Sequence, residues 1–415
     1  MRIPRTFKRW LGLLSVAAAT AMLVTACGGG DDNNGGGSGG GSSVSDGNTA
    51  NTAVITVGTG VAHVINIPTV NVKICVPGTT NCQVVNNVLV DTASYGLRLV
   101  SSALSSGVLN DLPQTTTGGA PVAECGKFVS SFTWGSVRTV DLSIGSEQAS
   151  SLPVQIIGDL GTSNVPSSCS NNGARTSANT ASDLGANGIL GIGPAPVDCG
   201  TSCATSTSAT SNNYYACPNG NSSCAVALVP VAQQVANPVH RFATDNNGVI
   251  VQMPNISSSG QSSATGLLTF GINTQSNNAL GASTVLTSTT TGDVDATFLG
   301  GSVTAFFDTG SNAYFFNDSS QKTCSTNTQF YCPSSTTTYT ATLTGKNGVS
   351  GGVSMPVANA DALFANSSTF AFNDIAGPFG AAGWLDIGMP HFYGKTIYFG
   401  MDRTGSGGAQ PYVAF

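Results

Sequence analysis

Charged side chains are scarce in this 415-residue chain, where Asp, Glu, Lys and Arg make up 8% of the residues, against about 25% in an average globular protein. Lys and Arg number 14 and Asp and Glu number 20, so the formal net charge is −6. The basic stripe of a nucleic-acid-binding protein is therefore missing, and we expect no nucleic-acid partner. Histidine is scarcer still, with only His63, His240 and His391, which excludes mechanisms that need several imidazole groups.

The N-terminus has the layout of an export signal. Four basic residues precede an apolar run from Leu11 to Val24, as in a secretory signal segment. Small residues then lead into Cys27, a pattern typical of a bacterial lipoprotein cleavage site. We expect residues 1–27 to be a lipoprotein signal segment with Cys27 as the lipidated residue; an ordinary secretory signal is the alternative.

Residues 28–51 are rich in Gly, Asn, Asp and Ser and lack hydrophobic periodicity, which predicts a flexible tether. Gly28, rather than an Asp, follows Cys27, and this favours the outer membrane of a Gram-negative cell envelope. We expect the lipid to be the only membrane contact, because no other apolar run approaches membrane-spanning length. The protein is expected to be a monomer.

Cysteine usage indicates an oxidising compartment. Eleven cysteines less Cys27 leave ten, an even number compatible with five disulfides. Cys125 and Cys169 are the natural long-range pair. The remaining cysteines lie close enough in sequence to pair locally, as Cys75/Cys82, Cys217/Cys224 and Cys324/Cys332. Cys199/Cys203 is a looser case. The cysteine pairs lack the two-residue spacing of a zinc site, and we expect neither a metal nor a cofactor.

The composition favours β-structure with long polar loops, because 52 Gly and many Ser, Thr and Asn accompany few helix-forming Glu and Lys. One pattern occurs twice: an apolar run leads into Asp-Thr-small-Ser at Val88–Ser94 and again at Thr304–Ser311. A carboxylate at the buried end of a strand is costly unless it meets hydrogen-bond donors or serves chemistry. The plain alternative is a tight turn in which Asp bonds its own backbone.

Other segments follow in a fixed order. An apolar-apolar-Gly element, Gly188–Gly193, comes after the first copy, a less regular one, Trp384–Gly388, comes after the second, and Gly266–Asn273 stands between them. In this order the chain resembles the pepsin-like bilobal aspartic peptidases. The resemblance implies a mainly β, two-lobed pepsin-like acid protease fold with a cleft between an N-terminal lobe at 52–273 and a C-terminal lobe at 274–415.

The resemblance also implies roles for individual residues. Asp91 and Asp308 would be the catalytic pair, meeting at a pseudo-twofold axis. The supporting residues would be the interlocking Thr92 and Thr309, the carboxylate-bracing Ser94 and Ser311, and Gly310. A flap hairpin would fall near Trp134 and Gly135.

Two adjacent carboxylates suit hydrolysis by an activated water. Held a few ångströms apart, they cannot both ionise, so the pair shares one proton. The ionised member can take a proton from the attacking water, while the protonated member hydrogen-bonds the developing oxyanion. The expected function is therefore that of an envelope-anchored aspartic endopeptidase acting on a peptide or protein substrate.

Three positions depart from the pepsin-like pattern. Ala93 stands where the family has Gly, Trp134 replaces the flap Tyr, and Arg98 replaces a Trp that packs on that Tyr. We expect the Arg98 guanidinium to lie over the Trp134 indole. The closing segment Gly388–Lys395 also resembles an uncharacterised family of secreted bacterial proteins, a divergent branch of the clan.

These departures support a competing hypothesis. A non-catalytic pepsin-fold surface module could bind a peptide or glycan in the same cleft, with Ala93 deforming the dyad. A purely structural envelope protein would explain the tether but not the paired motifs.

Overall fold

The computed structural model describes residues 50–415, and the expected signal segment, the lipidation site Cys27 and residues 28–49 of the tether lie outside the described residues. Ala50 and Asn51, which were also expected in the tether, belong to the fold. The side chain of Asn51 is buried and donates a hydrogen bond to the carbonyl of Phe270 at 2.8 Å. Strands dominate this part of the chain, as the mainly β prediction requires.

The larger of two sheets has seventeen strands. Fourteen of them lie before residue 274, and three lie after it. They are β1 (Thr52–Val57), β2 (Thr69–Cys75), β3 (Cys82–Asp91), β4 (Tyr95–Val100), β5 (Thr116–Thr117), β6 (Ala120–Lys127), β7 (Ser131–Ile144), β8 (Glu147–Ile157), β9 (Thr176–Ser177), β10 (Gly188–Ile192), β11 (Tyr214–Ala216), β13 (Ala225–Val226), β14 (Gly248–Gln252), β15 (Ala264–Phe270), β16 (Val285–Thr287), β24 (Thr396–Gly400) and β25 (Tyr412–Ala414).

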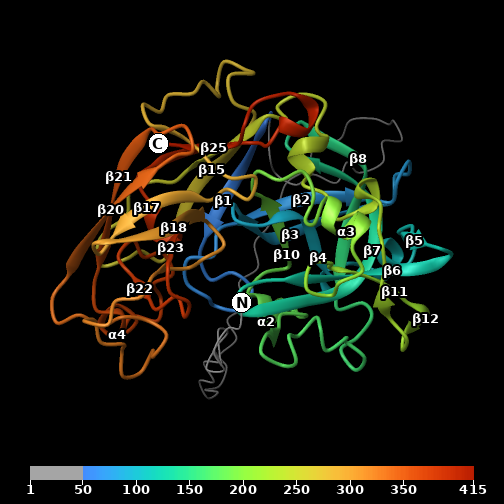
Figure 1. Cartoon of the computed structure of the whole chain (residues 1–415), viewed down its shortest axis with the longest axis horizontal. Helices are drawn as coiled ribbons and strands as arrows, with labels where there is room; N and C mark the ends of the chain where they lie inside the picture. The colour runs from blue at the N-terminus through green and yellow to red at the C-terminus, as the bar shows by residue number, and fades with distance from the viewer. Residues whose placement is uncertain (1–49) are drawn as a thin grey trace, which may run out of the picture.

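The second sheet has seven strands and occupies the opposite side of the molecule (Figure 1). Its strands are β17 (Val294–Phe298), β18 (Gly301–Asp308), β19 (Tyr314–Phe315), β20 (Thr337–Thr344), β21 (Ser350–Val357), β22 (Ala376–Gly377) and β23 (Trp384–Gly388). The short strand β12 (Pro218–Asn221) lies outside both sheets. Helices are single turns: α1 (Ser106–Leu109), α2 (Ala181–Leu184), α3 (Thr201–Thr205), α4 (Ala360–Leu363), and the 3-10 turns η1 (Ser101–Ala103), η2 (Val231–Gln233), η3 (Pro238–Arg241), η4 (Met389–His391) and η5 (Thr404–Ser406).

The sequence repeat is also a structural repeat. In the first half, β3 pairs in parallel with β10, which pairs antiparallel with β4. In the second half, β18 pairs in parallel with β23, which pairs antiparallel with β19. The register places Asp91 opposite Gly191 and Asp308 opposite Gly388. Each Asp therefore ends a strand beside an apolar-apolar-Gly strand, in the same relation twice.

Glycine is required in these two elements by close backbone approach. A Cβ atom on Gly191 would lie 2.7 Å from the Tyr95 backbone nitrogen, and one on Gly388 would lie 2.0 Å from the Ala313 carbonyl oxygen. Both distances are far shorter than van der Waals contact. The returning chain after each Asp loop can thus approach only because the paired strand carries no side chain there.

The two expected lobes share one sheet. Strands β24 and β25 come from the last 20 residues, yet β24 pairs with β14 and β25 pairs with β16 in the large sheet. The core is correspondingly continuous, because the principal buried cluster includes residues of both halves, such as Val90, Phe270 and Phe307. The large sheet therefore contains strands from both sides of the boundary at 273/274, whereas the small sheet lies wholly after it.

All ten cysteines of the described residues form disulfides. The five bonds are Cys75–Cys82, Cys125–Cys169, Cys199–Cys203, Cys217–Cys224 and Cys324–Cys332. Every expected pairing is confirmed, including the long-range one. Within residues 50–415 no helix has the length and apolar character needed to cross a membrane.

Candidate active site

Asp91 and Asp308 end their strands in equivalent turns. Asp91 Oδ1 accepts hydrogen bonds from the backbone N–H groups of Ala93 (2.9 Å) and Ser94 (3.1 Å), and Oδ2 accepts from the Ser94 hydroxyl (2.5 Å). Asp308 Oδ1 accepts from the Gly310 N–H group at 2.7 Å. Each carboxyl group is thus held by its own turn, and the donors fix the direction in which it points.

The hydroxyl groups of Thr92 and Thr309 join the two turns. Thr92 Oγ1 accepts from the Thr309 N–H group at 3.0 Å and donates to the Phe307 carbonyl at 2.9 Å. Reciprocally, Thr309 Oγ1 accepts from the Thr92 N–H group at 3.2 Å and donates to the Val90 carbonyl at 2.6 Å. Both side chains are buried. This reciprocal pair fixes the two Asp turns against each other across 217 residues of sequence.

The two carboxyl groups meet beside Gly310. The position that a Cβ atom would take on Gly310 lies 2.9 Å from Asp91 Cγ, 3.0 Å from Asp91 Oδ1 and 3.0 Å from Asp308 Oδ1. Burial raises the pKa of Asp308, and the negative charge of Asp91 raises that pKa further. Two carboxyl groups in this relation share a proton instead of ionising together.

The Ser residues of the two turns differ in their surroundings. Ser311 Oγ lies 2.8 Å from Asp308 Oδ2, as expected of a brace, and also 2.6 Å from Asp386 Oδ2. Asp386, in β23, is 3% exposed. This third carboxyl group was not among the residues predicted for the site. Its only signal in the sequence is an acidic residue inside an apolar-apolar-Gly element, where the first copy has Ile189.

Trp134 and Gly135 are not at the turn of the flap hairpin. Both residues lie in β7, which pairs with β6 in a hairpin, and the turn of this hairpin is residues 128–130, where Val129 is 70% exposed. Trp134 is fully buried; its indole N–H donates to Asn221 Oδ1 at 2.8 Å. A Cβ on Gly135 would lie 1.8 Å from a backbone oxygen of β8. Both residues therefore face the protein interior.

Arg98 does not lie over the indole of Trp134, and the expected pairing is wrong. Arg98 Nη2 lies 2.6 Å from Glu124 Oε1 and 3.5 Å from Asp198 Oδ2, and all three side chains are at most 4% exposed. The guanidinium carbon lies 5.9 Å from the centre of the Phe128 ring. Burial raises the pKa of Asp198 well above its ordinary value, with the charge of Glu124 as the next cause. A guanidinium with a carboxylate in reach binds that charge in preference to an indole.

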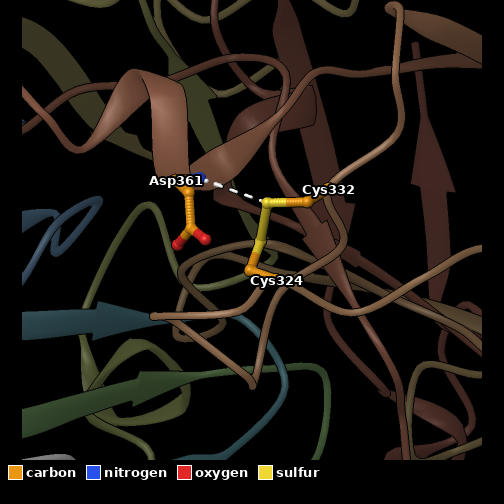
Figure 2. Close-up of side chains that lie close together, drawn as sticks. All are labelled: Cys324, Cys332 and Asp361. Atoms are coloured by element: carbon orange, nitrogen blue, oxygen red, sulfur yellow. Dashed lines mark hydrogen bonds between the residues drawn. A yellow bond between two sulfur atoms is a disulfide. The ribbon is translucent and has the colours of Figure 1, made fainter.

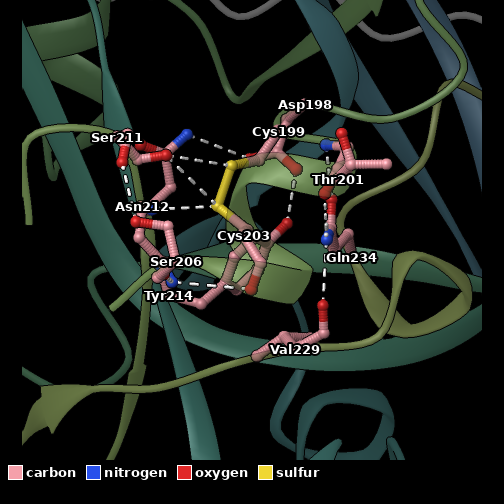
Figure 3. Close-up of a disulfide and its surroundings, with 12 residues drawn as sticks. Asp198, Cys199, Thr201, Cys203, Ser206, Ser211, Asn212, Tyr214, Val229 and Gln234 are labelled. Carbon is pink, nitrogen blue, oxygen red and sulfur yellow. Dashed lines mark hydrogen bonds between the residues drawn. A yellow bond between two sulfur atoms is a disulfide. The ribbon is translucent and has the colours of Figure 1, made fainter. Parts of the chain in front are cut away.

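The cysteine-rich insertion after β10 is a stapled loop packed on the large sheet. The Cys199–Cys203 disulfide joins the residues that precede α3 to α3 itself (Figure 3). The amide nitrogen of Asn212 donates to the backbone carbonyls of Ser206 and Ala227. Gln234 bonds the backbone of residue 200 and the carbonyl of residue 229. The hydroxyl of Tyr214 donates to Asp198. The insertion thus contacts the buried cluster of Arg98, Glu124 and Asp198, called the Arg98 cluster below, and not the Asp pair.

One group of possible metal ligands does not fit a metal. Cys324, Cys332 and Asp361 have ligand atoms within 4.8 Å of one another, but the two sulfur atoms are bonded to each other (Figure 2). The Asp361 carboxylate accepts hydrogen bonds from the backbone N–H groups of residues 325–327, and these bonds lower its pKa to about 2. The N–H groups bonded to Asp361 and the Cys324–Cys332 disulfide together hold the loop of residues 324–332 in place.

Comparisons with known proteins give a family but no activity. The aspartic proteinase from Irpex lacteus, a crystal structure, matches with a TM-score of 0.46 and 15% identity over 88% of this chain and 97% of that chain. No curated protein matches. The mainly β fold expected from the sequence is confirmed, and the same strand arrangement occurs twice, once around Asp91 and once around Asp308. The family model described as "Protein of unknown function (DUF3443)" matches residues 47–415, so the chain belongs to that family.

Proposed function

We propose that this protein is an aspartic peptidase that hydrolyses peptide bonds with Asp91 and Asp308. The observation that carries the proposal is the position of both carboxyl groups around one point beside Gly310. The reciprocal hydrogen bonds between Thr92 and Thr309 support it, because they hold the two Asp turns in one relative position, which the ends of two unrelated strands would not require. No imidazole or metal is required for this chemistry.

The hydrogen bonds suggest which carboxyl group carries the proton. Asp91 accepts bonds from Ala93 N, Ser94 N and Ser94 Oγ, and donors to a carboxylate favour its ionised form. Asp308 accepts fewer bonds, and its pKa is raised by burial and by the charge of Asp91. In the proposed resting state Asp91 is therefore ionised and Asp308 is protonated, although the titration belongs to the pair.

The proposed reaction follows from this assignment. Asp91 takes a proton from a water molecule as the water oxygen bonds to the scissile carbonyl carbon. Asp308 donates its proton to the carbonyl oxygen, which gives a neutral tetrahedral intermediate. The proton held by Asp91 then passes to the leaving nitrogen, the C–N bond breaks, and the proton of one hydroxyl returns to Asp308. The products are a carboxylic acid and an amine, and both carboxyl groups recover their starting protonation.

Cleavage of a denatured-protein library between pH 3 and pH 7 tests this function. We expect acid-favoured cleavage that a statine-type transition-state mimic blocks. Asp308→Asn and Asp91→Asn should each lower turnover at least about 100-fold, the scale of a lost general acid or base. Asp295→Asn is the matched control, because Asp295 lies in the neighbouring strand β17 and is 65% exposed. Equal activity in all variants would refute the dyad.

One observation favours the non-catalytic alternative. A Cβ atom on Gly310 would crowd both carboxyl groups. In the first turn the equivalent residue is Ala93, which does carry a Cβ atom. The alternative is a surface module that binds a peptide or glycan at the same place without turnover. Library peptides that bind at acid pH but remain uncleaved, with binding weakened by Asp308→Asn, would establish it.

We further propose attachment to the cell envelope through a lipid on Cys27, with the outer membrane of a Gram-negative bacterium as the location. The support is the sequence of the signal segment and the five disulfides, which suit an oxidising compartment. Mass spectrometry of the mature N-terminus tests the lipid. Cys27→Ser should release the protein from membranes, and a membrane-bound Cys27→Ser variant would contradict the anchor.

A further inference from the structure

Ser311 Oγ lies between two carboxyl groups, and its hydrogen-bond capacity constrains their protonation. It is 2.8 Å from Asp308 Oδ2 and 2.6 Å from Asp386 Oδ2. A hydroxyl group has one proton to donate. It can therefore donate to one of these oxygens only, and the other carboxyl group must carry a proton to make the second contact a hydrogen bond. One carboxyl proton thus belongs to the Asp386–Ser311–Asp308 chain.

The surroundings of Asp386 place that proton on Asp386. Its register partners are Phe306 in β18 and Phe315 in β19, so aromatic residues flank it on both sides. The side chain is 3% exposed, and Oδ1 has no hydrogen-bond partner among residues 50–415. An ionised carboxylate with one buried oxygen unpaired is far more costly than a neutral carboxylic acid in the same place.

Electrostatics act in the same direction. Burial raises the pKa of Asp386 well above its ordinary value, and the negative charge of the Asp308/Asp91 pair, the ionisable groups that act on Asp386, raises it further. Ser311 is its hydrogen-bond partner. The geometry and the charges therefore agree that Asp386 is neutral while the Asp91/Asp308 pair carries its negative charge.

We infer that Asp386 is a positioning residue for the dyad: as a neutral acid it donates to Ser311 Oγ, which commits the single hydroxyl proton of Ser311 to Asp308 Oδ2. Because Oδ2 is then an acceptor, the proton that Asp308 shares with Asp91 is held on Oδ1, the oxygen beside Asp91. The catalytic consequence rests on the proposed function, whereas the protonation of Asp386 does not.

The first half of the chain supplies an internal comparison. Ile189 occupies the position equivalent to Asp386, two residues before the glycine opposite the strand-ending Asp in each half. Ser94 Oγ donates to Asp91 Oδ2 without an acid behind it. Asp386 therefore makes the two halves of the dyad unequal, and it does so on the side of the proposed proton donor, Asp308.

If Asp386 ionised, the arrangement would reverse. The Ser311 hydroxyl would turn to the new carboxylate, and Asp308 Oδ2 would have to carry a proton to keep its bond to Ser311. That proton would then point away from Asp91 and from the site of reaction. Activity should accordingly fall as pH rises through the titration of Asp386, even though no proton leaves the dyad itself.

Infrared difference spectroscopy on the purified full chain tests the protonation directly. At pH 7 the wild type should show the carbonyl stretch of a buried protonated carboxyl group that disappears in Asp386→Asn and persists in the control Asp295→Asn. If the carbonyl-stretch region of protonated carboxyl groups were the same in wild type and Asp386→Asn, Asp386 would be ionised, which would overturn the inference whether or not the protein is a peptidase. Detection of the band with no cleavage of any substrate would refute the proposed function alone.

Kinetics test the positioning role. Asp386→Asn keeps a neutral donor toward Ser311 and should retain kcat within about threefold at acid pH, with activity extending to higher pH because Asn cannot ionise. Asp386→Ile, which copies Ile189, should lower kcat about tenfold with KM unchanged, the effect of one lost hydrogen bond. Thermal unfolding and circular dichroism check that both variants fold. Equal kcat and equal pH profiles for Asp386→Asn, Asp386→Ile and wild type would overturn the positioning role.

Discussion

Single residues set the geometry of the Asp pair, and Ala93 is the most informative of them. Its twin, Gly310, has no room for a Cβ, because one would lie 2.9 Å from Asp91 Cγ. Neither Ala93 nor Gly310 has a positive φ, so exchanging Ala and Gly at these positions adds no backbone strain. Crowding beside the dyad is therefore the property that the exchange changes.

Ala93→Gly should leave the thermal midpoint within about 2–4 °C of wild type and raise kcat several-fold, because it removes a methyl group from the turn position equivalent to Gly310. Gly310→Ala should do the reverse and lower kcat at least about tenfold, corresponding to about 1.4 kcal/mol of barrier. Steady-state cleavage at acid pH measures both. A wild type and an Ala93→Gly variant that are equally silent at every pH would favour the binding module.

His391 opposes stability in acid. It is 2% exposed, neither ring nitrogen has a partner in the described part of the chain, and burial lowers its pKa to about 3, with the charge of Lys395 as a smaller cause. The unfolded chain has an ordinary histidine pKa of about 6.5 and binds a proton first. Stability is therefore lost as pH falls from about 6.5 toward about 3, at up to about 1.4 kcal/mol per unit.

His391→Leu should remove this loss, so the free energy of unfolding should fall by about 2–3 kcal/mol less between pH 6 and pH 4 than it does in wild type. Urea unfolding at each pH measures the difference. The control is His63→Asn, since His63 is exposed and its positive φ of 55° suits Asn. Parallel stability curves for wild type and His391→Leu would show that His391 does not titrate with folding.

At the scale of strands and loops, the pattern along the chain predicted some features and missed others. The two Asp turns were predictable because each motif is local: an apolar strand, Asp, Thr, a small residue and Ser. The disulfides were predictable from counting and proximity. The position of the flap turn was not, because the spacing of 43 residues from Asp91 to Trp134 carries no information about loop lengths in between.

The partners of Arg98 and Trp134 show why long-range contacts escaped prediction. Arg98 bonds Glu124 and Asp198, which are 26 and 100 residues away, and Trp134 bonds Asn221. Two of these partners, Asp198 and Asn221, stand at or inside the cysteine-rich insertion, where no periodicity indicates how the chain returns to the sheet. Asp386 was visible as an odd residue in its strand, but its contact with Ser311 depends on the twist of two strands.

The buried ion pairs of Arg98 join β4 to β6 and to the cysteine-rich insertion, and they predict a loss of stability when the cation is removed. Arg98→Met leaves the buried acids Glu124 and Asp198 without a cation and should lower the free energy of unfolding by about 3–5 kcal/mol. Lys346→Met removes an exposed ion pair with Asp295 and should cost less than about 1 kcal/mol. Urea unfolding of both variants measures the contrast. Equal losses would mean that the buried cluster is not a joint.

At the scale of the whole molecule, both halves of the chain complete each other. Strands β24 and β25 close the large sheet from the far end of the sequence, and the Thr92–Thr309 interlock joins the Asp turns. A site made of one turn from each half is useful only while the halves keep one relative position. Shared strands provide that rigidity more directly than a separate interface between two independent lobes would.

Asn66 ties the halves together most completely. Its amide nitrogen donates to the carbonyls of Asn312 and Phe372 at 2.8 Å each, and its amide oxygen accepts from the Phe372 N–H group at 2.8 Å and from the Tyr393 hydroxyl at 2.9 Å. The side chain is fully buried, and its φ of 53° is one that Asn tolerates better than most residues. All its hydrogen-bonding capacity is used by residues of the second half.

The full chain should therefore unfold in one calorimetric transition, with equal calorimetric and van't Hoff enthalpies. Asn66→Ala leaves several buried groups unpaired and should lower the free energy of unfolding by about 3–5 kcal/mol while keeping a single transition. Asn317→Ala, which removes an exposed amide that donates to the Ala381 carbonyl and accepts from the Gly380 N–H group, should change it by less than about 1 kcal/mol. Two separate transitions, or a shift of only part of the unfolding in Asn66→Ala, would show independent lobes. The Asp pair would then depend on a movable interface, and its geometry would vary with the motion of one lobe against the other.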